Sequence, residues 1–174
     1  MAQLFESYAG SDDTTTNING VNWFTMTFTP SASHTITSVF ITFYKEGSPG
    51  TITVSIRATD GAGKPTGSDL ASGTTNGNTL PNDPSREKRE ITLGAGTPLS
   101  ASTKYAVVVR ALSGDSLNQV HPSLDNTSPS YAGGSFGTSA DSGATWTMNT
   151  GIDVNFEEWG ELSGQFMSLN KNYW

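Results

Sequence analysis

The sequence predicts an all-β protein built as an antiparallel β-sandwich. Its 174 residues include 24 Thr and 22 Ser, while only 14% of them are charged. The branched Cβ of Thr, Val and Ile favours strands. Short runs of alternating apolar and polar residues are separated by turns rich in Gly, Pro and Asn, a pattern typical of sandwiches.

The first strand is expected at 21–29, because Phe24, Met26 and Phe28 alternate with polar neighbours. Residues 104–111 are apolar on both faces, which indicates a central strand. The segments 47–50, 60–67 and 94–98 contain the Gly and Pro of turns. Further strands are expected at 35–44, 51–59, 70–74, 88–93, 146–148 and 152–156. About eight or nine strands in this arrangement favour a jelly-roll topology.

We expect three parts: an N-terminal arm over 1–20, the β-sandwich over 21–160 and a C-terminal tail over 161–174. The arm is polar apart from Leu4, Phe5 and Tyr8. Apolar residues three to four apart leave a short helix over 156–169 as an alternative, although Gly160 and Gly164 each disfavour it by about 1 kcal/mol relative to Ala.

The net charge of −7 belongs almost wholly to residues 111–170, which contain seven carboxylates and no Lys or Arg. This segment is either a docking or cation-binding surface or an ordinary solvated face. A pI near 4.6 argues against nucleic-acid partners. The longest apolar run covers only 106–109, so no membrane helix is expected. The N-terminus has neither a basic nor an apolar leader region, so we expect synthesis in a cytoplasm.

Catalytic groups are sparse, and the protein is expected not to be an enzyme. It has no cysteine, and neither His34 nor His121 lies near a Gly-x-Ser-x-Gly elbow. No spacing forces Asp153 and Glu157 or Glu158 into a glycosidase cleft. No cofactor or metal is assigned. Loop aspartates leave a structural calcium ion open, although no calcium-loop motif is present.

The sharpest local motif runs Ser139-Ala-Asp141-Ser-Gly143-Ala-Thr145-Trp146. It resembles the Asp box of sialidases, Ser-x-Asp-x-Gly-x-Thr-Trp, which in those proteins has a structural role and repeats around a propeller. Here the motif occurs once, so it predicts a hairpin turn and not a sialidase. In such a turn the Asp carboxylate accepts backbone N–H bonds, Gly supplies a positive φ and Trp packs beneath.

Aromatic residues occur on both faces of the first two expected strands. This arrangement is typical of a carbohydrate platform, a partner interface or a face covered by a second layer. If sugars stack on this protein, the candidate residues are Trp23, Tyr131 and Trp159.

Several runs together resemble one group of domains: 37–41, 50–56, 63–67, 99–109, the Asp box and Asp153-Val-Asn-Phe156. They are similar to jelly-roll domains of microbial surface proteins and of phage and virus structural proteins, which are related in architecture to carbohydrate-binding modules. The resemblance covers about residues 21–160 and brings no catalytic residues with it.

This resemblance implies a non-enzymatic virion protein, made in the host cytoplasm, such as a capsid decoration protein or a tail or fibre subunit. Its partners would be copies of itself and a major capsid or tail protein. The alternative is a carbohydrate-binding module that stacks surface glycans on exposed aromatic residues. The expected assembly contacts are apolar residues of the arm and the tail: Leu4, Phe5, Tyr8, Phe166, Tyr173 and Trp174.

Overall fold

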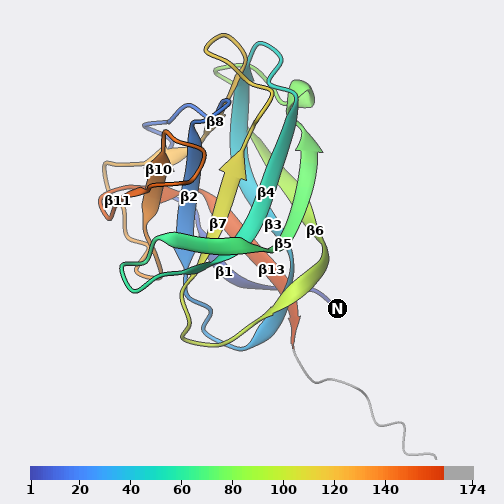
Figure 1. The fold of residues 1–174 in the computed structure, drawn as a ribbon, viewed down its shortest axis with the longest axis vertical. Coiled ribbons are helices and arrows are strands. Elements are labelled where there is room, and N and C mark those ends of the chain that lie inside the picture. The colour runs from blue at the N-terminus through green and yellow to red at the C-terminus, as the bar shows by residue number, and fades with distance from the viewer. Residues whose placement is uncertain (163–174) are drawn as a thin grey trace, which may run out of the picture.

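The structure, a computed structural model, describes residues 1–162 and is an antiparallel β-sandwich (Figure 1). Sheet A has the order β1 (Gln3–Tyr8), β13 (Phe156–Leu162), β3 (His34–Glu46) and β6 (Glu87–Leu99), and β8 (Gln119–Pro122) pairs with the C-terminal end of β3. Sheet B has the order β11 (Thr147–Asn149), β10 (Phe136–Ser139), β2 (Trp23–Phe28), β7 (Tyr105–Arg110), β4 (Thr51–Thr59) and β5 (Pro65–Asn76).

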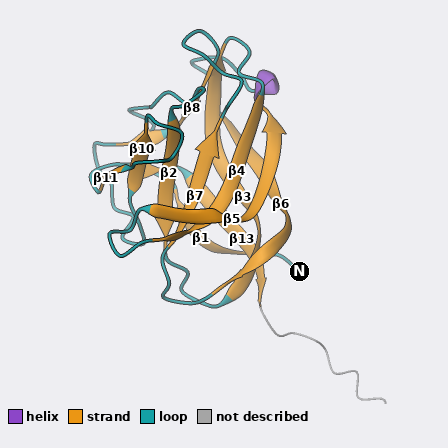
Figure 2. Cartoon of the chain, in the orientation of Figure 1, coloured by secondary structure: helices purple, strands orange, loops and turns teal. Residues whose placement is uncertain are grey.

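Strands and loops make up nearly all of the described chain (Figure 2). A short pair, β9 (Leu124–Asp125) and β12 (Asp153–Val154), forms a third small sheet, and the one helical turn in residues 1–162 is η1 (Gly77–Thr79). These residues hold thirteen strands, more than the eight or nine expected, because several are only two to four residues long. The all-β sandwich is confirmed, and the jelly-roll topology stays a prediction.

The main core lies between the two sheets and follows the strand alternation. Phe24 and Phe28 on β2 and Ile56 on β4 meet Ile41 and Phe43 on β3, and all five are fully buried. Burial of each such side chain contributes about 1.5–3 kcal/mol. The alternation along these strands therefore determines which face of each sheet packs against the other sheet.

A second, smaller cluster lies on the outer face of sheet B. It contains Trp23, Ala106, Val108 and Trp146. Because Ala106 and Val108 face this cluster while their neighbours on β7 face the main core, β7 is apolar on both sides. It lies between β2 and β4, as expected for a central strand.

Two local expectations are wrong. The segment 94–98 does not turn the chain but lies inside β6, where Gly94 and Gly96 have φ values of +61° and +74°. The register with β3 shifts opposite this segment, so the positive φ values produce an irregularity instead of a reversal. The helix considered for 156–169 is excluded over its first half, because Phe156–Leu162 is β13. Residues 163–169 lie outside the described part of the chain.

The first and last described strands pair with each other. Gln3 is opposite Gly160, and Tyr8 is opposite Phe156. The expected arm therefore begins with a strand of sheet A, while residues 11–18 run beside β8 and β9 through isolated bridges. Among residues 1–162, no helix has the length and apolar character needed to cross a bilayer.

Candidate functional site

The outer face of sheet A carries a group of partly exposed aromatic and charged side chains, Phe40, Trp159, Lys88 and Glu157, which we call the aromatic face. Val39 and Ile41 point into the core, so alternation turns Phe40 outward. The register places Glu157 opposite Phe40. The rings of Phe40 and Trp159 lie 6.1 Å apart at an interplanar angle of 57°.

The charged pair fixes the orientation of these rings. Lys88 forms an ion pair with Glu157, and its Nζ lies 5.4 Å from the Phe40 ring centroid. The Trp159 indole N–H donates to Glu157 Oε2 over 2.9 Å. Partial burial acts to raise the pKa of Glu157, but the hydrogen bonds from Lys88 and Trp159 outweigh it and leave that pKa below its ordinary value. The face thus presents an oriented indole beside a carboxylate and an ammonium group.

A depression of about 150 Å³ adjoins this face. Lys88, Glu157 and Thr42 line it together with residues 8–10 and 155–156. Asn155 connects the segments around the depression. Its Oδ1 accepts the Gly10 N–H over 2.7 Å, and its Nδ2 donates to Ser11 O and Ser123 Oγ. An oriented ring beside a small hollow that is lined in part by Lys88, Glu157 and Thr42 is the kind of surface on which a sugar stacks and hydrogen-bonds.

The Asp-box residues form a closed turn between β10 and β11. Asp141 Oδ1 accepts the Thr145 N–H over 2.8 Å, and Oδ2 accepts the Thr145 hydroxyl over 2.6 Å. The Ser139 hydroxyl donates to Asp141 and accepts the Gly143 N–H. Gly143 has a φ of +81°, and Trp146 is buried beneath. Hydrogen bonds, first from the Thr145 side chain, lower the pKa of Asp141 to about 2.

The three candidate stacking residues lie in different surroundings. Trp23 is only 9% exposed, donates from its indole N–H to Gly20 O, and has two guanidinium groups, those of Arg57 and Arg110, within 6 Å of its ring. Tyr131 is half-buried against the main core, and burial followed by the nearby Glu6 raises its pKa. Trp159 is the one of the three that lies on the aromatic face.

The arm residues expected at assembly contacts also differ. Leu4 is 44% exposed. Phe5 stacks on His34 with ring centroids 3.6 Å apart, and the Tyr8 hydroxyl donates to Asp125 over 2.7 Å. Leu4 thus has the freest side chain of the three. Phe166, Tyr173 and Trp174 lie outside the described residues.

Two histidines have environments that the sequence did not indicate. His34 and Glu158 are both 0% exposed, and His34 Nε2 lies 2.6 Å from Glu158 Oε1. Burial, opposed by His34, raises the pKa of Glu158 to about 7. One signal was available, because Glu158 shares the strand parity of Phe156 and therefore the core side.

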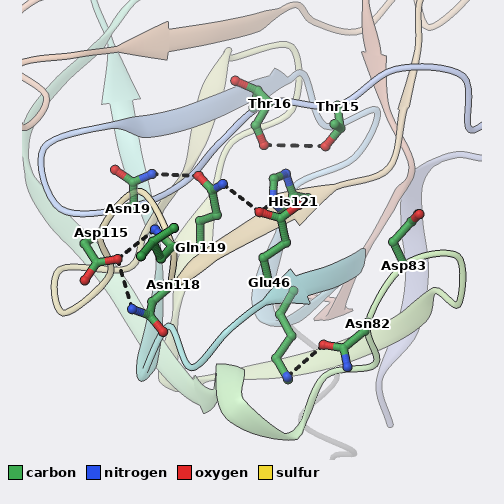
Figure 3. Close-up of polar contacts among 12 residues, drawn as sticks. Thr15, Thr16, Asn19, Glu46, Asn82, Asp83, Asp115, Asn118, Gln119 and His121 are labelled. Carbon is green, nitrogen blue, oxygen red and sulfur yellow. Dashed lines mark hydrogen bonds and ion pairs between the residues drawn. The ribbon is translucent and has the colours of Figure 1, made fainter.

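His121 of β8 lies beside Glu46 and near Gln119 (Figure 3). Both of its ring nitrogens are buried without a hydrogen-bond partner, and its ring stacks on Tyr44 at 4.5 Å. Glu46, which accepts a hydrogen bond from Gln119, is 3.8 Å from His121 Nε2. Burial lowers the pKa of His121.

Carboxylates in the described chain serve mainly as acceptors within the protein. Asp125, for example, accepts the Tyr8 hydroxyl and the backbone N–H groups of Ser11, Thr127 and Ser128. Within residues 1–162, no three His, Asp or Glu side chains are grouped so as to hold a metal ion.

Comparison with known proteins adds no relative to these observations. No protein-family model matches the chain, and no curated protein sequence is similar to it at a significant level. The functional argument therefore depends on the residues described above.

Proposed function

We propose that the protein is a non-enzymatic structural subunit of a virion, a capsid decoration protein or a tail or fibre subunit. In this proposal it contacts copies of itself and a major capsid or tail protein. The supporting observation is the pairing of β1 with β13, which brings the N-terminus and the end of the described chain to one edge of sheet A. The Met1 amino group lies 3.2 Å from Glu161 Oε1.

This edge exposes apolar side chains that an interface would bury. Leu4 is 44% exposed, Leu162 is 47% exposed, and Met1 is fully exposed. Removal of apolar surface from water contributes about 25 cal/mol per Å², so a contact formed here gains affinity from the hydrophobic effect. The expected tail contacts, Phe166, Tyr173 and Trp174, follow this edge in the sequence.

The test compares two leucines of matched exposure. Leu4→Asp places a charge at the proposed contact, whereas Leu70→Asp places the same charge at a residue 46% exposed on β5 of the other sheet. We expect Leu4→Asp, and deletion of 163–174, to abolish self-association and binding to purified particles, measured by light scattering and co-sedimentation. Leu70→Asp should behave as wild type. A wild-type protein that neither self-associates nor binds particles contradicts the proposal.

Glycan binding is a second candidate, supported by the position of Trp159 beside Phe40 and the adjoining depression. A pyranose ring stacked on the indole would have Glu157 and Lys88 within reach of its hydroxyl groups. On a glycan array, Trp159→Ala should abolish binding while Trp159→Tyr retains part of it. Wild-type protein without bound glycans, or Trp159→Ala with full binding, excludes this candidate.

A further inference from the structure

The buried His34–Glu158 pair lies under the first strand. Phe5 of β1 stacks flat on the His34 ring, with 7° between the planes, and Glu6 is paired across the strands with Glu158. A Cβ on Gly160 would clash with the His34 ring, so the absence of a side chain there lets the imidazole fit against β13. The pair is thus enclosed between β3, β13 and β1.

The hydrogen bonds determine how many protons the pair holds. His34 Nδ1 lies 2.9 Å from the Ala32 carbonyl, which only accepts, so Nδ1 carries a proton. The 2.6 Å contact of Nε2 with Glu158 Oε1 then requires one further proton between two acceptors. Whichever atom holds it, the pair is neutral overall. Glu158 Oε2 is buried without a partner, so an unshared carboxylate charge has no compensation.

We propose that the proton shared by His34 and Glu158 is a latch that holds β1 on the sandwich, and that its loss above neutral pH releases β1. Without this proton, a carboxylate faces a ring lone pair in a site that excludes water. Separation of β1 hydrates the charge by removing Phe5 and Glu6 from the pair. β1 is an edge strand of sheet A, so its release breaks strand pairing with β13 alone.

The pH range follows from the sign of the shift. Burial raises the pKa of Glu158 to about 7, against about 4.3 for an exposed Glu. In the open state an exposed His34 would hold this same proton up to about pH 6.5, so opening releases no proton between about pH 4.3 and 6.5. Closure therefore loses free energy as the pH rises above about 6.5. The other titratable groups facing the pair are Glu6 on β1 and Tyr131, whose hydroxyl lies 3.3 Å from Glu6 Oε2. The Met1–Glu161 ion pair, at the exposed end of β1, needs a separate control.

The latch is a property of the single chain and does not depend on the proposed virion contacts. If those virion contacts exist, release of β1 would move Leu4 and make the contacts sensitive to pH. The two proposals can therefore fail separately, since hydrogen exchange of the β1 amides tests the latch and particle binding tests the virion contacts.

Hydrogen exchange of the β1 amides, corrected for intrinsic rates and referred to the central strand β7, tests the latch between pH 5 and 8. In the wild-type protein, protection of residues 3–8 should fall about threefold more than protection of β7, because the closed pair holds its proton up to about pH 7 and an exposed His34 only up to about pH 6.5. Glu158→Gln, whose amide donates to Nε2 as the protonated carboxyl does, should keep β1 protected at every pH. Equal loss of protection in β1 and β7, or none, overturns the proposal.

Two matched controls isolate the pair. Glu157→Gln, one residue away on the outer face, and Glu161→Gln should both retain the pH dependence of the wild type. If Glu158→Gln also retains it, the proposal is wrong. Should that variant not fold, the labelled side-chain carboxyl signal of Glu158 in the wild-type protein decides. Its titration near neutral pH together with β1 release supports the latch, whereas titration below pH 5 overturns it.

Discussion

Gly143 of the Asp-box turn lies directly against Trp23 of β2. A Cβ on Gly143 would come within 2.8 Å of Trp23 Cζ3, and the glycine has a φ of +81°. The Ser142 N–H also donates to Val21 O over 3.0 Å. The turn therefore covers the outer face of sheet B at Trp23, which explains why this tryptophan is buried although it points away from the main core.

Gly143→Ala should destabilise the protein by about 1–3 kcal/mol, because both the positive φ and the contact with Trp23 oppose a side chain. Urea unfolding measures the change. Gly61→Ala is the matched control, since a Cβ there meets nothing within 4 Å. An equal effect of the two substitutions would show that the turn does not depend on this contact.

Asp141→Asn should reduce stability near neutral pH and flatten its dependence on pH in acid. The pKa of Asp141 is lowered to about 2, first by the Thr145 hydroxyl, so its stabilising contribution is present above about pH 4 and lost as the pH falls through 2. Urea midpoints from pH 6 to 2 test this. Glu90→Gln, which removes an exposed carboxylate on β6, is the control and should leave the slope as it is.

His121→Phe should raise the free energy of unfolding by about 1 kcal/mol, because phenylalanine keeps the stack on Tyr44 and leaves no buried nitrogen unpartnered. The gain should be larger at pH 5 than at pH 8. Burial lowers the pKa of His121, so wild-type stability falls as the pH drops below about 6.5. Melting temperatures at both pH values measure this, and a variant less stable than wild type at pH 5 contradicts it.

Tyr8→Phe and Asp125→Asn should show strong coupling in a double-mutant cycle. The Tyr8 hydroxyl donates to Asp125 Oδ2 over 2.7 Å and joins the end of β1 to β9, which is 117 residues away in the chain. Asp125→Asn alone should cost more than Tyr8→Phe, because the carboxylate also accepts three backbone N–H groups. Additive effects would mean that this hydrogen bond does not anchor β1.

The core could be predicted closely where strand alternation is regular. The strand expected at 51–59 is β4, and Phe24, Met26 and Phe28 do share the core side. Strand boundaries were harder to predict where the sequence contains glycine. Residues 94–98 contain the same residue types as a turn, but pairing of Pro98 with Thr35 keeps the segment extended. The residue types of the segment do not indicate that partner.

The candidate site needed contacts from distant segments. Trp159 and Phe40 are each aromatic residues on a strand, but only the register of β13 with β3 brings their rings together. His34 and Glu158 are 124 residues apart, and nothing local to either residue indicates the shared proton.

The sequence by itself determined the features that depend on neighbouring residues: the all-β class, the alternation of the core strands and the residue types of the turn around Asp141. The side-chain hydrogen bonds of this turn stay within residues 139–145. Only the tertiary structure decided which outward-facing aromatic residues are covered, that β1 pairs with β13, and that Glu158 is buried against His34. Alternation assigns a side chain to one face of its strand, but burial of that face depends on segments that approach from elsewhere in the chain.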